Sequence, residues 1–205
     1  MWGRCLAAGD ALTWCVVRNE FEGMKTSAGE VLSDFFDRRL IIAPIGLDHF
    51  ADVRNLHASA LREGTSGVLS ETELQALLDL IASPRYSDVL LQEEIYGGWI
   101  DDELVGTASW HTNSDDGRAA RIGWVFVRHP RFGIGRRLVT EVEARAQQSG
   151  FNQLAVSATA NAIPFFERLG YQVASRGVRN LGQDCALPVA FMRKFLLRPV
   201  RARLS

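Results

Sequence analysis

The sequence predicts an α/β (α+β) fold: a mixed, mostly antiparallel central sheet of about six to seven strands flanked by helices. Two observations predict it. Candidate strands in the middle of the chain are joined by short polar turns, whereas residues 121–158 read as strand, helix, strand. A tight hairpin pairs its strands antiparallel and a helical crossover pairs them parallel, so both pairings are expected in one sheet. A doubly wound parallel sheet does not fit this order.

The bulk composition narrows the class of protein. The chain has 205 residues, enough for one well-buried domain, and a formal net charge of −1. This near-neutral balance argues against a general nucleic-acid or membrane-surface binder, which would carry a large basic excess. No apolar run reaches about 18 residues, and Asp10, Arg18 and Glu20 interrupt any secretory signal. The cysteines show no metal-ligand spacing, so we expect a cytoplasmic protein without a bound metal.

The pattern changes near Arg39. Residues 1–38 have mixed polarity, no strong period and a second methionine at Met24. They are expected to be an N-terminal extension of a domain at 39–197, or else an adjunct to its core. A basic tail follows at 198–205.

The first part of the domain is predicted to be one short strand followed by two helices. An apolar run at 40–45 predicts a strand, and apolar residues spaced by three and four predict a helix from about Asp48. Ser70-Glu71-Thr72-Glu73 is typical of a capping box and opens a second helix, which Ser83-Pro84 ends. Residues 86–94 fit a helix or a strand.

Hairpin signals come next. Ile95–Ile100 and Leu104–Trp110 are predicted strands joined by the turn at Asp101-Asp102-Glu103, and Asp115-Asp116-Gly117 is a second turn. The remaining predicted strands are 121–127, 153–158, 171–178 and 187–195, and the remaining predicted helices end at Gln148 and Leu169.

The stretch from Val127 to Leu138 predicts a seat for an anion. An apolar strand runs into a turn rich in arginine and glycine, which opens directly into a helix. Free backbone N–H groups and the positive end of the helix dipole then point at one spot. Gly133 permits a positive φ and Gly135 permits tight packing. The alternative is a solvated basic turn in which Arg137 pairs with Glu141.

Two further segments add to this turn: Phe165-Phe166-Glu167-Arg168-Leu169-Gly170-Tyr171 and Phe191-Met192-Arg193-Lys194. In this order and spacing, the chain resembles the GNAT superfamily of acetyl-CoA-dependent N-acetyltransferases over residues 40–197. The resemblance implies direct transfer of an acetyl group from acetyl-CoA to a primary amine of a small molecule or a protein. It also implies no metal, no nucleic-acid or membrane partner, and a monomer or homodimer.

The resemblance further implies where the cofactor binds. The strands at 121–127 and 153–158 would splay apart, with the pantetheine arm along the first strand and the diphosphate on the turn. The cofactor-binding residues that it implies are Val125, Phe126, Val127, Arg131, Phe132, Gly133, Ile134, Gly135, Arg136, Asn161, Phe165 and Phe166.

The chain departs from the family pattern in three places. The family's turn usually begins with Arg or Gln, where this chain has Pro130, and Arg131 replaces a frequent glycine. The phenol that donates a proton to the leaving thiolate in many relatives is replaced by Phe166, which has no proton to donate. Arg121 stands where some relatives carry a carboxylate base.

No catalytic residue carries over from the family, so candidates come from the residues themselves. They are His111 at a strand end, Glu94 with its neighbour Glu93, and Ser157. The alternatives are a surface histidine, a solvated acidic pair and a hydroxyl that satisfies backbone groups. Cys185 is expected in a loop.

Trp99, Trp110 and Trp124 fall in successive strands, and either floor an acceptor pocket or pack in the core. Two rival functions also stand beside the enzyme: a CoA-binding sensor or interaction module without catalysis, and a structural protein whose basic turn is merely solvated.

Overall fold

The computed structural model describes residues 39–65, 67, 69–112, 119–128, 132–182 and 185–196. The predicted extension at 1–38, the turn at 115–117 and the tail at 198–205 lie outside this set. The elements in chain order are β1 (Ile41–Pro44), η1 (Leu47–His49), α2 (Phe50–Gly64), α3 (Glu71–Ala82), α4 (Pro84–Leu90), β2 (Glu94–Ile100), β3 (Glu103–Thr112), β4 (Ala119–Val127), α5 (Ile134–Gln148), β5 (Gln153–Ala158), α6 (Ile163–Arg168), β6 (Gln172–Gly182) and β7 (Cys185–Phe195).

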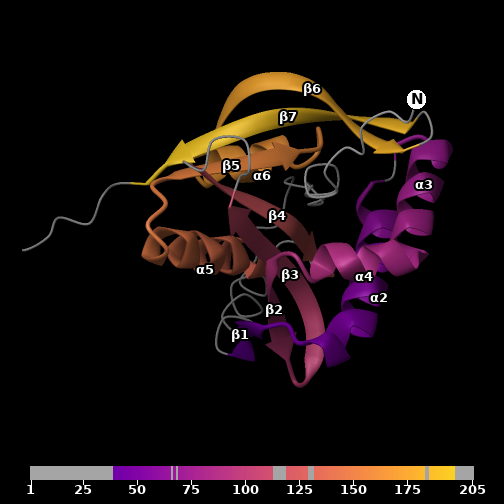
Figure 1. The fold of residues 1–205 in the computed structure, drawn as a ribbon, viewed down its shortest axis with the longest axis horizontal. Helices are drawn as coiled ribbons and strands as arrows, with labels where there is room; N and C mark the ends of the chain where they lie inside the picture. The colour runs from indigo at the N-terminus through magenta and orange to yellow at the C-terminus, as the bar shows by residue number, and fades with distance from the viewer. Residues whose placement is uncertain are drawn as a thin grey trace, which may run out of the picture.

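The strands form one seven-stranded sheet in the order β1-β2-β3-β4-β5-β7-β6 (Figure 1). Its pairings are antiparallel except that of β4 with β5, which is parallel. The predicted mixed, mostly antiparallel sheet is therefore confirmed.

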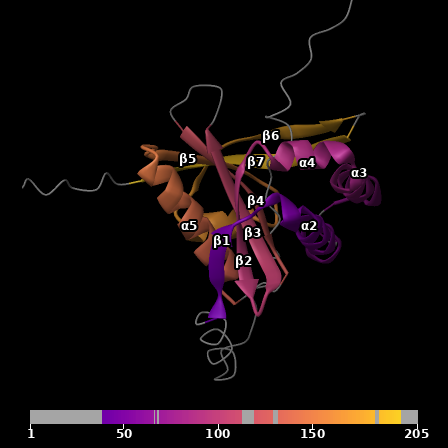
Figure 2. The ribbon, with the colours of Figure 1, turned by 60° about the horizontal axis from the view of Figure 1, so that its bottom comes forward.

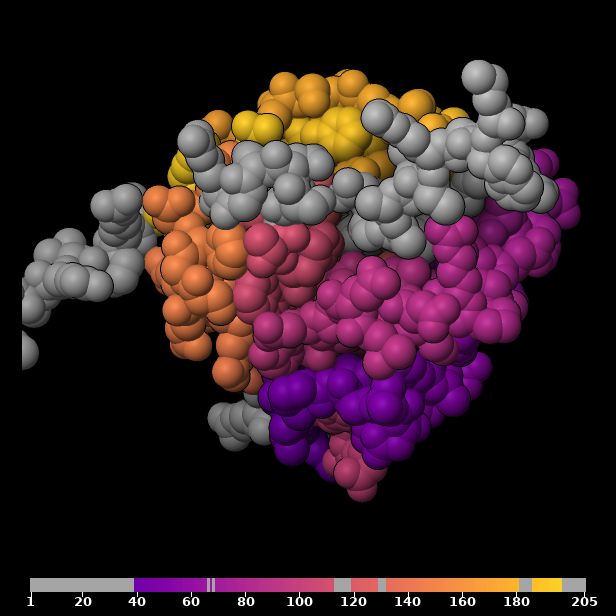
Figure 3. Space-filling view, in the orientation of Figure 1, coloured from indigo at the N-terminus to yellow at the C-terminus, as the bar shows by residue number. Residues whose placement is uncertain are grey.

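The sheet separates two helical layers (Figure 2). Helices α5 and α6 pack on one face over a core that includes Leu138, Val142 and Phe166. Helices α2, α3 and α4 pack on the other face over a second core that includes Leu56, Leu77 and Trp124. In the space-filling view these three helices form a continuous layer on one side of the molecule (Figure 3). We call the two sides of the sheet the α5 face and the α2 face.

Local sequence signals account for the helix starts and the hairpin. The side chain of Ser70 accepts from the N–H of Glu73, whose carboxylate accepts from the N–H of Ser70, so the predicted capping box is present. Pro84 ends α3 and begins α4, where its missing N–H costs no helical bond. Asp101 and Asp102 have φ of 50° and 63°, the positive pair that a two-residue hairpin turn requires.

Two parts of the structure differ from the sequence prediction, and a third decides between alternatives that the sequence left open. Residues 86–94, which fitted helix or strand, divide between the end of α4 and the start of β2. Cys185, expected in a loop, is the first residue of β7. β6 and β7 also run longer than predicted, because each strand continues through polar and charged residues that weaken the alternating pattern.

The two central strands part half-way along. β4 pairs with β5 from Ala119 opposite Gln153 to Ile122 opposite Val156, and the pairing ends there although β4 continues to Val127. The splay expected between 121–127 and 153–158 is therefore present, and it opens towards the N-terminus of α5.

Candidate functional site

The edge of β4 that faces the gap carries backbone polar groups at alternate residues. The N–H of Arg128 donates to the carbonyl of Val105 at 2.9 Å, which turns the polar groups of residues 126 and 128 towards β3. Since N–H and C=O groups alternate sides along a strand, those of Val125 and Val127 point to the opposite edge, towards the gap. An extended ligand in the gap would meet donors and acceptors there.

The N-terminus of α5 lies next to this edge. Gly133 precedes the helix with φ 75°, a left-handed conformation that glycine adopts without strain, and no described side chain caps the helix. The first helical hydrogen bond runs from Arg137 to the carbonyl of Gly133, so the N–H groups of Ile134, Gly135 and Arg136 have no acceptor within the helix. These groups can hold an anion.

Three predicted site segments meet at Gly135. A methyl group added to this residue would lie 3.2 Å from Val127 and 3.4 Å from Phe165. The end of β4, the first turn of α5 and helix α6 therefore come together, and a side chain at residue 135 would have to push these neighbours outward by a few tenths of an ångström. Phe132 and Phe165 are both half-buried here, whereas Arg131 lies outside the described residues.

Arg137, in the first turn of α5, contacts the backbone just before β1. Arg137 donates to the carbonyl of Leu40 at 3.3 Å, while Glu141 pairs with Arg145 at 2.8 Å in the carboxylate-first order. Arg136 is exposed beside the uncapped amides, where a bound anion would offset its unfavourable interaction with the helix dipole.

Asn161 ties the loop after β5 to helix α2. Its amide nitrogen donates to the carbonyl of Gly64 at 3.0 Å, and its amide oxygen accepts from Thr159 at 2.6 Å. Both ends of this side chain are thus engaged within the protein.

Polar side chains on the α2 face gather on β3. Thr107, Ser109 and His111 alternate along the strand and therefore share this face. Ser109 donates to the carboxylate of Glu93, and Nδ1 of His111 lies 3.6 Å from Oε1 of the same carboxylate. Ser109 is paired with Gly123, the residue at which β4 leaves β5. A carboxylate and an imidazole therefore adjoin the apex of the gap.

This cluster corrects two expectations. The side chain of His111 is 18% exposed and that of Glu93 is 5% exposed, so neither is the solvated surface group that the sequence suggested. The signal that could have revealed the cluster is the alternation of Thr107, Ser109 and His111 in a strand that is otherwise apolar, because alternate polar residues facing a core require partners.

Glu94 and Ser157, the other catalytic candidates, occupy different surroundings. Glu94 is exposed and paired with Trp110, whose indole packs in the core of the α5 face, so Glu94 lies on the opposite side of the sheet from His111. Ser157 is buried on β5 and accepts from Nη2 of Arg179 at 3.1 Å. Because its neighbours Val156 and Ala158 belong to the α5 core, Ser157 points to the α2 face, across the gap from Ser109.

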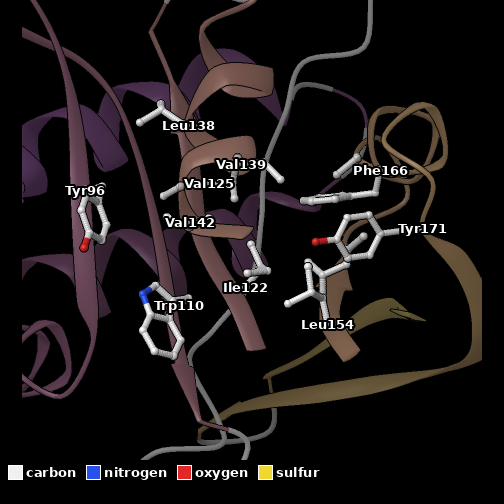
Figure 4. Close-up of a cluster of buried hydrophobic side chains, with 14 of the residues drawn as sticks. Tyr96, Trp110, Ile122, Val125, Leu138, Val139, Val142, Leu154, Phe166 and Tyr171 are labelled. Atoms are coloured by element: carbon white, nitrogen blue, oxygen red, sulfur yellow. The ribbon is translucent and has the colours of Figure 1, made fainter. Parts of the chain in front are cut away.

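Phe166 and Tyr171 lie together in the core of the α5 face, with ring centroids 5.3 Å apart (Figure 4). Both side chains are buried. The chain therefore carries a phenol near Phe166, but in the turn between α6 and β6 and not on the helix itself.

The three tryptophans of the strands do not line one common pocket. Trp110 packs in the core of the α5 face, Trp124 in the core of the α2 face, and Trp99 beside His49 with ring centroids 4.8 Å apart. The core interpretation holds for the first two, so these side chains do not gather around an acceptor.

Among the described residues, no group of three or more His, Cys, Asp or Glu side chains is arranged to hold a metal ion. No helix in the same part of the chain combines the length and apolarity needed to cross a membrane.

With this geometry established, comparison with known proteins identifies the family. The model of the acetyltransferase (GNAT) family matches residues 56–171, more than half of the chain. No curated protein matches. This chain belongs to the GNAT acetyltransferase family.

Solved structures share the fold at low sequence identity. A GCN5-related N-acetyltransferase from Rhodopseudomonas palustris is 21% identical with a TM-score of 0.66, covering 76% of this chain and 95% of its own. PaiA N-acetyltransferase from Thermoplasma acidophilum, solved with coenzyme A, is 15% identical (TM-score 0.57, 76% and 98% covered). The Salmonella typhimurium protein yncA, solved with its cofactor acetyl-CoA, is 17% identical (TM-score 0.55, 81% and 99% covered).

Proposed function

We propose that this chain transfers the acetyl group of acetyl-CoA directly to a primary amine of a small molecule or a protein. The observation that carries the proposal is the gap between β4 and β5, which has an unpaired strand edge on one side and the uncapped start of α5 at its mouth. Family membership supports it, as do two similar folds solved with coenzyme A or acetyl-CoA.

In this proposal the diphosphate of acetyl-CoA lies on the N–H groups at the start of α5, together with Arg131 of the preceding turn. The pantetheine arm runs along β4 and bonds to the backbone at Val125 and Val127. Helix α6, with Phe165 and Phe166, packs beside the thiol end of the cofactor. The amine then approaches from the α2 face, where the polar groups of β3 and β5 lie on both sides of the gap.

The reaction requires a neutral, deprotonated amine as the nucleophile and hydrogen-bond donors for the developing oxyanion. The neutral amine nitrogen attacks the thioester carbon, the carbonyl oxygen becomes negative, and backbone N–H groups of β4 stabilise it. The intermediate then collapses and expels the CoA thiolate. Phe166 offers no proton to that thiolate, and general-acid help contributes only about 10²–10⁴-fold, so its loss slows the reaction without preventing it.

Glu93 is the proposed general base. Its carboxylate bonds to Ser109 beside the apex of the gap, and the imidazole of His111 adjoins it. The carboxylate would accept a proton from the attacking amine, with His111 stabilising the charged carboxylate when the imidazole is protonated. Of the three catalytic candidates from the sequence, the proposal keeps His111 beside the base. Ser157, bonded to Arg179, would line the opposite side of the gap, and Glu94 would take no part in the reaction.

The test combines binding with turnover. Calorimetry and thermal unfolding with acetyl-CoA measure binding, and a ligand present at about 100 times its Kd should raise the unfolding free energy by ~2.7 kcal/mol. Release of CoA over a panel of primary amines then measures transfer. Thermal unfolding unchanged by millimolar acetyl-CoA would reject the proposal and favour a structural protein.

One observation favours a second function, a CoA-binding sensor. Phe166 stands in place of the usual general acid, and Arg121 stands in place of the carboxylate base. Both side chains are buried. Tight acetyl-CoA binding with no CoA release at any pH and with any amine would establish the sensor.

A further inference from the structure

A chain of buried hydrogen bonds links helices α2 and α4 to the backbone of β4. Oη of Tyr86 lies 2.5 Å from Nδ1 of His57, and Nε2 of His57 lies 2.7 Å from Oγ1 of Thr107. Oγ1 of Thr107 donates to the carbonyl oxygen of Trp124 at 2.7 Å. The four residues are fully buried, so water does not replace any of these bonds.

The direction of each bond follows from its end point. A carbonyl only accepts, so the hydroxyl of Thr107 donates to Trp124, and its oxygen is left to accept from Nε2–H of His57. A neutral imidazole has one N–H, so Nδ1 must accept from the hydroxyl of Tyr86. Burial lowers the pKa of His57 to about 3 and raises that of Tyr86, which keeps both groups in the neutral forms that this order requires.

The chain ends on the one irregular point of β4. Thr107 pairs with Phe126 and Ser109 with Gly123, so Trp124 and Val125 together face the single residue Ala108 in a β-bulge. Trp124 has φ 48°, a left-handed conformation that costs a bulky residue about 1–3 kcal/mol. Surrounding structure must hold such a residue in place.

Two of these side chains, His57 and Tyr86, also contact the ring of Trp124. The imidazole of His57 lies parallel to the indole, with centroids 5.8 Å apart and planes 6° apart. The phenol of Tyr86 meets the indole edge-on at 5.3 Å. His57 is also stacked on Phe126, the second residue after Trp124, at 4.1 Å.

Holding the carbonyl of Trp124 fixes the next N–H. In a trans peptide the C=O of one residue and the N–H of the next point in opposite directions within one plane. Because the carbonyl of Trp124 points to Thr107, the N–H of Val125 points away from it, on the side of the gap. This amide lies three residues beyond Ile122, the last residue of β4 that pairs with β5.

We propose that Tyr86, His57 and Thr107 form a positioning relay that orients the Trp124–Val125 peptide, so that the N–H of Val125 faces the thioester carbonyl of acetyl-CoA. None of the three touches the substrate. The inference rests on the proposed function, because it assigns a task to the backbone that the thioester would meet. It adds α2 and α4 to the elements that determine the rate.

Thr107→Val tests the relay, since valine keeps the shape and removes the hydroxyl. We expect kcat to fall about tenfold or more while the KM for acetyl-CoA changes less than about threefold, because the diphosphate seat at α5 is untouched. Thr107→Ser restores the hydroxyl and should return kcat to within about threefold of the wild type. Tyr86→Phe, which removes the first donor, provides a second variant if Thr107→Val does not fold.

Thr65→Val is the matched control, because Thr65 is also a buried threonine whose hydroxyl donates to a carbonyl, that of Leu61 at 2.6 Å. It should leave kcat unchanged. Equal losses of kcat in Thr65→Val and Thr107→Val would overturn the relay, and so would wild-type kcat in Thr107→Val.

Amide spectra separate failure of the relay from failure of the proposed function. Acetyl-CoA should shift the amides of both Val125 and Gly135 in the wild type, but in Thr107→Val only that of Gly135 should shift as before. An unchanged response of Val125 in that variant would overturn the relay even if no acceptor amine is known. A wild type in which neither amide responds would reject the proposed function, and the relay's task with it.

Discussion

At the scale of single residues, the candidate site depends on positions where a side chain is absent. Gly133 is exposed with φ 75°, and a methyl group added there would meet no atom within 4 Å. The space beside Gly133 is therefore open. A side chain placed there would occupy the position of a ligand and would not overlap other protein atoms.

Gly133→Glu should consequently abolish acetyl-CoA binding while the protein stays folded, because a carboxylate would occupy the place of the diphosphate. We expect the affinity to fall more than about tenfold, a loss above 1.4 kcal/mol by calorimetry. Gly150→Glu is the matched control, since Gly150 follows the same helix with φ 95° and is equally open. An equal loss of affinity in both variants would remove the turn from the site.

Glu93→Gln tests the proposed base. The amide keeps the bond to Ser109 but accepts no proton, so kcat should fall about 10²–10⁴-fold with little change in the KM for acetyl-CoA. Glu94→Gln, on the other face of the sheet, should leave kcat within about threefold of the wild type. Steady-state CoA release over pH 6 to 9 measures both variants. Wild-type turnover in Glu93→Gln would exclude Glu93 as the base.

At the scale of elements, the contact between α5 and its neighbours sets the width of the proposed binding site for the cofactor. A methyl group at Gly106 of β3 would lie 2.8 Å from Leu138, and one at Gly135 would lie 3.2 Å from Val127. Both glycines let α5 approach the sheet closely, one under the helix and one at its start.

Gly135→Val should push the start of α5 away from β4 and α6. Forcing a larger residue into this contact is expected to lower the unfolding free energy by about 1–3 kcal/mol and to weaken acetyl-CoA binding. Urea unfolding and calorimetry measure the two effects. Unchanged values for both would mean that the first turn of α5 adjusts freely, contrary to the packing seen around Gly135.

Elements defined by local chemistry were predictable from sequence. The Ser70–Glu73 capping box, the turn at Asp101 and Asp102 and the left-handed Gly133 are each encoded within a few residues. The bulge at Trp124 was not predictable, because no glycine marks it and its stabilising partner Thr107 is 17 residues away. The burial of Glu93 also escaped prediction, since it depends on Ser109 in the next strand.

At the scale of the whole molecule, His57 couples stability to pH. Its pKa is about 3 in the folded protein and 6.5 in the unfolded reference, because burial disfavours the charged form. The unfolded state therefore binds the additional proton, so this contribution to stability is complete above about pH 6.5 and is lost as the pH falls.

We expect His57 to lower the unfolding free energy by on the order of 1–2 kcal/mol between pH 6.5 and pH 5. Urea unfolding of the wild type and of His57→Gln at both pH values isolates this effect, since the variant should lack that part of the pH dependence. Carbon chemical shifts of the imidazole provide an independent measurement and should show a neutral ring at pH 5. Equal pH dependence in the two proteins would contradict the buried, neutral histidine.

The short join between β4 and β5 has a mechanical consequence. In the described part of the chain, only the four pairs from Ala119–Gln153 to Ile122–Val156 connect the strand ladder β1–β4 to the ladder β5-β7-β6. The sheet can therefore widen along this seam without breaking any other ladder. A long, flexible thioester could then slide in sideways while both halves keep their own amide protection.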